Sequence, residues 1–141
     1  MIQPVIRCSE QLEYYVINGG KAATKSATAV ALMYQAQGEP WSKTDNLAFQ
    51  PGEADAIRKL FTNPNRDEAR ANGVRIGGKK YFVTSFESGS RSLYGMQGPN
   101  GCVIVTTNSS IIVAICEPPI DQKLCIAAVE GFADYLMKLN Y

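Results

Sequence analysis

Two consecutive apolar runs near the end of the chain constrain its fold more than any other feature of the sequence. The first covers residues 102–107 and the second covers residues 111–116. The intervening Asn108-Ser109-Ser110 has the composition of a turn, so we expect an antiparallel hairpin. Both sets of alternate positions in each run are apolar or small, which is typical of strands covered on both sides. We therefore place this hairpin in the middle of a sheet that lies between two layers.

A helix is predicted directly after the hairpin, over residues 121–139. Glu117 and the two prolines that follow it end the strand, and Asp121 is a favourable N-cap. The apolar positions of this helix recur at spacings of three and four residues and form one inward stripe, made of Leu124, Cys125, Ala128, Val129, Phe132 and Leu136. The charged positions are expected on the wetter side, at Lys123, Glu130, Asp134 and Lys138.

The first half of the chain is predicted to contain two helices and two strands. Residues 4–18 have apolar side chains at helical spacing and end before a glycine pair, so we expect a helix. The apolar run 27–34 predicts a strand, and Trp41-Ser42 begins a second short one. Residues 51–62 predict a helix with inward positions at Ala54, Ile57, Leu60 and Phe61. The polar segment 65–72 is either a helical turn or a loop.

The middle of the chain contains a specific hairpin signal. Gly77-Gly78 separates residues 74–76 from residues 79–84, and a glycine pair is typical of a two-residue hairpin turn. Residues 90–94 predict a further strand. Residues 95–101 contain three glycines and a proline, and they are predicted as a loop.

These elements together predict an α+β fold. Its centre is an antiparallel sheet of about six to seven strands, with the N- and C-terminal helices on one face and the short helices on the other. We expect the 141 residues to form a single domain. The sequence has no run of roughly 18 apolar residues and no basic segment followed by an apolar core at its start, so we expect neither a membrane span nor a secretory signal.

Composition excludes several classes of function. The sequence has no histidine, which excludes Ser-His and Cys-His catalysis and histidine-ligated metal sites. The net charge of +1 provides no field for nucleic acid. The cysteines lack metal-type spacing and are expected to be reduced and structural, as in a cytosolic protein; they are Cys8, Cys102, Cys116 and Cys125. We therefore expect no metal, no cofactor and no catalytic residue.

Four blocks of the sequence resemble the profilin family in their order and spacing. They are residues 46–63, 71–81 (ANGVRIGGKKY), 91–95 (RSLYG) and 129–136 (VEGFADYL). The resemblance extends over nearly the whole chain and identifies it as similar to a divergent member of that family. It implies a monomeric, non-enzymatic cytoplasmic protein of the cytoskeleton, which binds monomeric actin and proline-rich proteins such as formin-type elongation factors. Members of the family typically also bind phosphoinositides.

The resemblance also implies two binding surfaces. The surface for proline-rich peptides corresponds to Leu12, Tyr15, Trp41, Tyr135, Leu136 and Tyr141, with Leu12 in the place of a usual tryptophan. Flat aromatic faces suit the proline rings of a polyproline II helix, and the ligand loses little entropy because this helix is preformed. The surface for actin corresponds to Lys80, Val83, Arg91, Lys123 and Glu130.

Two other readings remain open. Some positions depart from the family pattern and favour an adaptor that keeps the proline site but binds actin weakly; they are Met96, Gln97, Ile126 and Gly131. The second reading is a small-ligand sensor or an enzyme with similar layering, since a fold does not fix a function. Cys116 and Cys125 would then be the only nucleophile candidates, and their apolar surroundings raise a thiol pKa.

Overall fold

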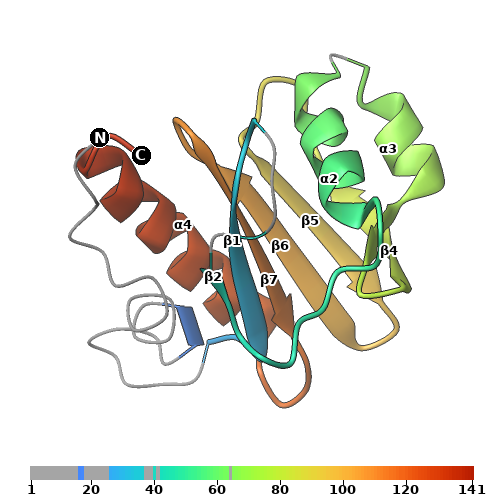
Figure 1. Ribbon diagram of the computed structural model, residues 1–141. Helices are drawn as coiled ribbons and strands as arrows, with labels where there is room; N and C mark the ends of the chain where they lie inside the picture. The colour runs from blue at the N-terminus through green and yellow to red at the C-terminus, as the bar shows by residue number, and fades with distance from the viewer. Residues whose placement is uncertain (1–15, 18–25, 37–39, 41, 64) are drawn as a thin grey trace.

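A seven-stranded antiparallel sheet forms the centre of the structure, a computed structural model that describes residues 16–17, 26–36, 40, 42–63 and 65–141 (Figure 1). The strand order across the sheet is β2-β1-β7-β6-β5-β4-β3. The strands are β1 (Ala29–Tyr34), β2 (Ser42–Lys43), β3 (Val74–Ile76), β4 (Lys79–Ser85), β5 (Ser92–Gln97), β6 (Asn100–Thr106) and β7 (Ser110–Cys116). This sheet and its helices confirm the predicted α+β fold.

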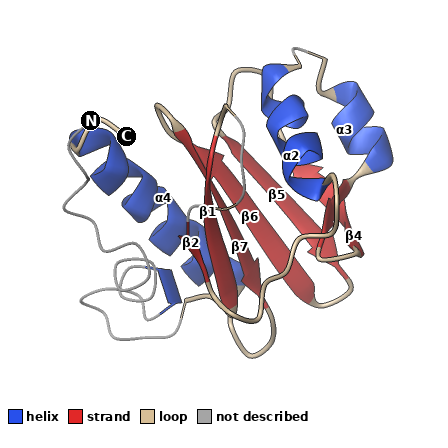
Figure 2. Ribbon diagram, viewed as in Figure 1, coloured by secondary structure: helices blue, strands red, loops and turns tan. Residues whose placement is uncertain are grey.

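The helices lie on both faces of the sheet. The long helix α4 (Gln122–Lys138) covers one face, and the short helices α2 (Glu53–Thr62) and α3 (Asp67–Asn72) lie at the other (Figure 2). The predicted N-terminal helix falls outside the described residues, apart from two positions. One of them, Val16, is fully buried in the same core cluster as α4. Within the described part of the chain, no helix is both long and apolar enough to cross a membrane.

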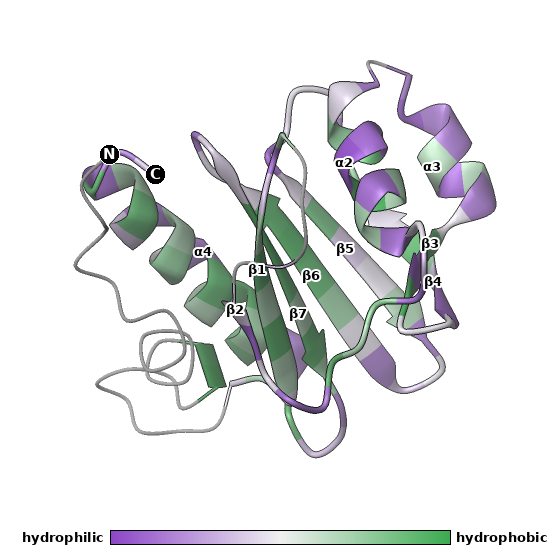
Figure 3. Ribbon diagram, in the orientation of Figure 1, coloured by the Kyte–Doolittle hydropathy of each residue, from purple (hydrophilic) through white to green (hydrophobic). Residues whose placement is uncertain are grey.

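Strand β7 shows why the sheet lies between two layers. All seven of its residues are buried, and successive side chains alternate between two core clusters. Ile112 and Ala114 belong to the cluster under α4, whereas Ile111 and Val113 belong to the cluster under α2 and α3. The central strands are accordingly the most continuously hydrophobic part of the sheet (Figure 3). The prediction of a hairpin covered on both sides is confirmed.

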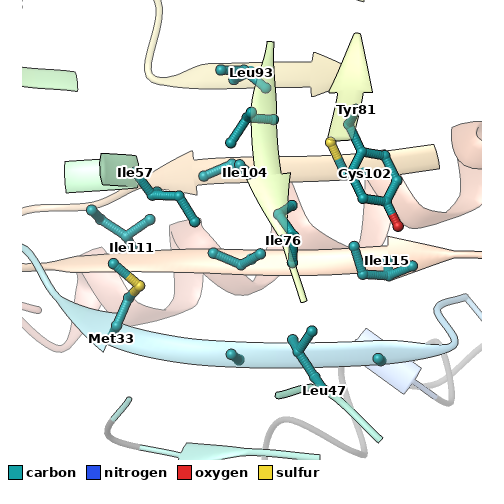
Figure 4. Close-up of a cluster of buried hydrophobic side chains, with 14 of the residues drawn as sticks. Met33, Leu47, Ile57, Ile76, Tyr81, Leu93, Cys102, Ile104, Ile111 and Ile115 are labelled. Carbon is teal, nitrogen blue, oxygen red and sulfur yellow. The ribbon is translucent and has the colours of Figure 1, made fainter. Parts of the chain in front are cut away.

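The second core cluster joins α2 to the sheet. Ile57 reaches from α2 toward the sheet, where Ile104 and Ile111 lie beneath it (Figure 4). The two buried charged residues of α2 were not foreseen as inward positions. Glu53 accepts hydrogen bonds from the backbone N–H groups of Gly77 and Gly78, at 2.7 and 2.8 Å, and so fixes the β3–β4 turn. The Nε of Arg58 donates to the Tyr34 carbonyl at 2.7 Å.

The Gly77-Gly78 turn is confirmed, since β3 ends at Ile76 and β4 begins at Lys79. Both glycines have positive φ, at 61° and 81°, as the favoured two-residue turn requires. The predicted loop over residues 95–101 is wrong, because β5 continues to Gln97 and β6 begins at Asn100.

The glycines in this segment mark close contacts between neighbouring strands and helices. A Cβ on Gly95 would lie 2.9 Å from the Phe82 carbonyl oxygen. A Cβ on Gly101 would lie 2.9 Å from the Cys116 sulfur. Glycine inside a strand commonly marks such an approach, and here it was mistaken for a loop signal.

Smaller boundary differences follow from local geometry. The polar segment 65–72 contains α3, and the predicted start of α2 at Pro51 shifts to Glu53. The predicted inward position Leu124 is wrong, since this side chain is 44% exposed. Around the helix, Leu124 lies to one side of the buried positions, so its side chain does not point at the sheet.

Candidate functional site

Helix α4 presents two different flanks on either side of its buried stripe. Its first turn is capped by the Asp121 side chain, which accepts from the Lys123 backbone N–H at 3.0 Å. We define the Glu130 flank as Lys123, Ile126, Glu130 and Asp134, and the Tyr135 flank as Leu124, Ala128, Tyr135 and Leu139. Glu130 and Tyr135 are five residues apart, so their side chains project about 140° apart around the helix. One helix can therefore serve two separate surfaces.

The Glu130 carboxylate is the centre of a hydrogen-bond network with β5 and the residue before it. Its Oε1 accepts from Nε of Arg91 at 3.0 Å and pairs with Nη2 of Arg91 at 2.8 Å. Its Oε2 accepts from the Ser92 hydroxyl at 2.6 Å and from the Tyr94 hydroxyl at 2.9 Å. Arg91 also pairs with Asp134 at 3.0 Å. These contacts hold the Glu130 flank against the sheet.

The network also sets the protonation of its members. Burial alone would lower the pKa of the Arg91 guanidinium, but hydrogen bonds to Asp134 and Glu130 raise it above its usual value. Burial, together with the hydrogen bond to Glu130, raises the pKa of the Tyr94 phenol. Arg91 is therefore a cation near neutral pH and Tyr94 remains a hydroxyl donor, which keeps the network intact.

Beyond this network the sheet presents an exposed apolar side chain. Phe82 on β4 is 63% exposed, more than any other large hydrophobic residue of the described part of the chain. It is directly opposite Met96 on β5, and the ammonium of Lys80 lies 5.4 Å from the centre of its ring. We call Lys80, Phe82 and Met96 the β4–β5 patch.

Four of the five residues predicted to contact actin share this side of the molecule. Lys80 belongs to the β4–β5 patch, Arg91 pairs with Glu130, and Glu130 and Lys123 lie on the same flank of α4. Val83 does not share this side. Successive side chains of a strand alternate between faces, and Val83 packs against the cluster under α2 and α3.

Among the described members of the predicted proline site, Tyr135 lies on the Tyr135 flank, Leu136 on the buried stripe of α4 and Tyr141 beyond the end of the helix. The ring of Tyr135 stacks on Phe132, with centroids 6.0 Å apart and an interplanar angle of 22°. Leu136 is fully buried in the core under α4, so its side chain has no exposed surface for a peptide. The other predicted members of this site lie outside the described residues; they are Leu12, Tyr15 and Trp41.

Tyr141 is fixed by the turn between β6 and β7. Its carbonyl oxygen accepts from the Ser109 backbone N–H at 2.6 Å, from the Ser109 hydroxyl at 3.0 Å and from the Thr107 hydroxyl at 2.8 Å. Its own N–H donates to the Leu136 carbonyl at 2.9 Å. The partly buried Tyr141 side chain packs against the same core cluster as Tyr135. No pattern in the sequence predicts this contact between Tyr141 and the hairpin turn.

The described cysteines are buried and form no disulfide bond. Burial raises the pKa of the Cys102 thiol to about 12. A hydrogen bond with Cys116, followed by burial, raises the pKa of Cys125, whereas the same hydrogen bond lowers the pKa of Cys116. Cys116 is only 2% exposed, so no substrate reaches its sulfur. The described residues also contain no cluster of three metal-ligating side chains.

The antiparallel sheet between a long helix and two short ones, together with the two flanks of the last helix, defines a small layered α+β fold with two candidate binding surfaces. The Profilin family model matches residues 13–141. Profilin-1 of Dictyostelium discoideum is 34% identical over 111 residues, which cover 79% of this chain and 85% of that protein. The chain belongs to the profilin family.

Solved structures agree with this assignment. Acanthamoeba castellanii profilin IA superposes with a TM-score of 0.76 at 26% identity, covering 92% of this chain and 99% of that one. Mouse profilin IIa, solved in complex with a double repeat from the FH1 domain of mDia1, superposes with a TM-score of 0.74 at 14% identity, covering 96% and 100%. The predicted family is therefore confirmed.

Proposed function

We propose that this protein binds monomeric actin and proline-rich segments on two separate surfaces, and that it thereby regulates the assembly of actin filaments in the cytoplasm. The observation that carries the proposal is the division of α4 into two flanks of different chemistry. Membership of the profilin family supports the same assignment. The protein acts as a monomer without chemical catalysis, by holding both partners at once.

Actin is assigned to the surface made of the β4–β5 patch and the Glu130 flank. This surface combines an exposed aromatic ring with two lysines at its edge, Lys80 and Lys123. Interfaces of stable complexes typically have such an apolar centre inside a polar rim. The Glu130 network supports the assignment because it fixes α4 relative to β5 before a partner arrives.

Proline-rich segments are assigned to the surface around Tyr135 and Tyr141, and the resemblance to the family adds Tyr15, Trp41 and Leu12 to this site. Mouse profilin IIa, which has the same fold, was solved with a formin FH1 repeat bound. Tyrosine hydroxyls can donate to the exposed carbonyls of a polyproline II ligand, while the rings contact its prolines. The clamped backbone of Tyr141 supports this use by lowering the entropy lost on binding. Leu136 contributes to this site indirectly, through its packing in the core under α4.

Two titrations test the proposal. The first measures the effect of the protein on nucleotide exchange and spontaneous polymerisation of actin, with Lys80→Glu as a weakened variant. The second follows the fluorescence of Trp41, the only tryptophan, during addition of a proline-rich peptide. Saturable binding in both titrations supports the proposal, and an absence of both would refute it.

An adaptor that binds proline-rich partners with little affinity for actin is a second candidate. The observation that favours it is the internal pairing of Arg91 with Glu130 and Asp134, because this cation is already used within the chain. Met96 and Gln97 add no charge to compensate. Proline-peptide binding without any effect on actin would select this candidate. Binding of phosphoinositides stays a prediction.

A further inference from the structure

Phe82 is the most exposed large hydrophobic residue of the described part of the chain. A single exposed apolar side chain is ordinary on a protein surface, so its exposure alone indicates nothing. Phe82, however, is paired across the strands with the partly exposed Met96. Directly opposite residues of neighbouring strands have Cβ atoms about 4.5–5.5 Å apart, so the two side chains form a continuous apolar surface.

The ring of Phe82 also has a cation beside it. The ammonium of Lys80, two residues earlier on the same strand, lies 5.4 Å from the ring centre, within the range of a cation–π contact. A flexible lysine therefore borders the ring without covering all of it, since Phe82 stays 63% exposed. The exposed part of the ring can enter a pocket of a partner.

Three charged residues next to β5 are paired with one another within the chain. Arg91 faces two carboxylates, Glu130 at 2.8 Å and Asp134 at 3.0 Å. The remaining oxygen of Glu130 is occupied by the hydroxyls of Ser92 and Tyr94. A partner would have to break these bonds before it could form ion pairs with Arg91 or Glu130.

We propose that the Phe82–Met96 pair is the apolar anchor of the actin-binding surface, and that binding there depends on burial of this pair more than on ion pairs. This inference rests on the proposed function and adds the residues that set its affinity. It follows that the affinity for actin changes little with ionic strength, because salt screens charged contacts and leaves apolar burial in place.

The test measures the dissociation constant of the full chain for polymerisation-blocked monomeric actin at about 0.01 and about 0.15 M salt. Phe82→Ser is expected to weaken binding at least tenfold, as for a buried aromatic anchor. Lys80→Gln is expected to weaken it less. Leu124→Ser is the matched control, because Leu124 is also an exposed apolar residue but lies on the Tyr135 flank. The Leu124→Ser variant should bind actin with the affinity of the wild type.

Four other results would overturn the inference, and they can be told apart. Wild-type protein that binds no actin overturns the proposed actin function and this inference with it. Wild-type protein that binds, with Phe82→Ser binding equally well, overturns the inference alone. A steep loss of wild-type affinity with salt also overturns it. Sedimentation of the wild type as a dimer that Phe82→Ser converts to monomer would assign the pair to a second copy of this chain.

Discussion

The two flanks of α4 hold their side chains by different means. On the Glu130 flank a carboxylate accepts from Arg91, Ser92 and Tyr94, so hydrogen bonds tie the helix to β5. On the Tyr135 flank the described contacts are a ring stacked on Phe132 and packing against the core. Substitutions on the first flank should therefore affect stability, and substitution of the partly buried Tyr135 on the second should mainly affect binding.

The largest effect on stability is expected from substitution of Leu136, which tests whether this side chain belongs to the core or to the peptide site. Leu136→Ala removes a fully buried side chain and should lower the free energy of unfolding by about 2–5 kcal/mol. Urea unfolding followed by circular dichroism measures this loss. Fully folded Leu136→Ala protein should bind proline-rich peptides nearly as well as the wild type. A stable variant with no peptide affinity would show that Leu136 contacts the ligand.

Glu130 gives the next largest effect. Glu130→Ala leaves the buried Ser92 hydroxyl and the Tyr94 hydroxyl without their acceptor, and should cost about 1–3 kcal/mol of stability. Glu130→Gln is the matched control, because its amide oxygen can still accept one of these bonds. Urea unfolding measures the free energy of unfolding of both variants. An unchanged midpoint for Glu130→Ala would mean that the network contributes nothing.

Tyr135→Ala tests the other flank. It should weaken the binding of a proline-rich peptide by about tenfold, since tyrosine is enriched among the residues that dominate interfaces. Tyr135→Phe keeps the ring that stacks on Phe132 and should lose less. Fluorescence titration measures both variants. Equal affinity of Tyr135→Ala and the wild type would remove this flank from the peptide site.

The smallest effect is expected at Asp134. Its carboxylate pairs with Arg91 but its side chain is 64% exposed, so solvent screens the interaction. Asp134→Asn should change the free energy of unfolding by about 0.5 kcal/mol or less. Thermal unfolding of this variant beside Glu130→Ala separates the exposed arm of the network from its partly buried centre. A loss as large as that of Glu130→Ala would contradict this ranking.

Much of the fold could be predicted because its signals are local. The double glycine at 77–78 defines a turn by backbone conformation alone, and the two-sided burial of β7 follows from a run of apolar residues. The prediction failed at Gly95 and Gly101, where glycine reflects contact with another strand or helix. Such contacts depend on residues distant in sequence, so composition alone does not identify them.

The candidate site was predictable only in part. The resemblance supplied Lys80, Arg91, Lys123 and Glu130 as separate positions, but the pairing of Arg91 with Glu130 joins residues 39 apart and was not foreseen. Phe82 could have been found, since period-two alternation places it on the same face as Lys80. Its exposure depends on how far α4 extends over the sheet, and this extent cannot be predicted from the sequence.

Actin and proline-rich peptides should bind two independent surfaces, one including the β4–β5 patch and one including the Tyr135 flank, and one paired measurement tests this. Actin affinity and proline-peptide affinity are determined for the wild type, Phe82→Ser and Tyr135→Ala, with circular dichroism as the check on folding. We expect Phe82→Ser to lose affinity for actin and keep affinity for the peptide, and Tyr135→Ala to lose affinity for the peptide and keep affinity for actin. A folded variant that loses both ligands at once would contradict it.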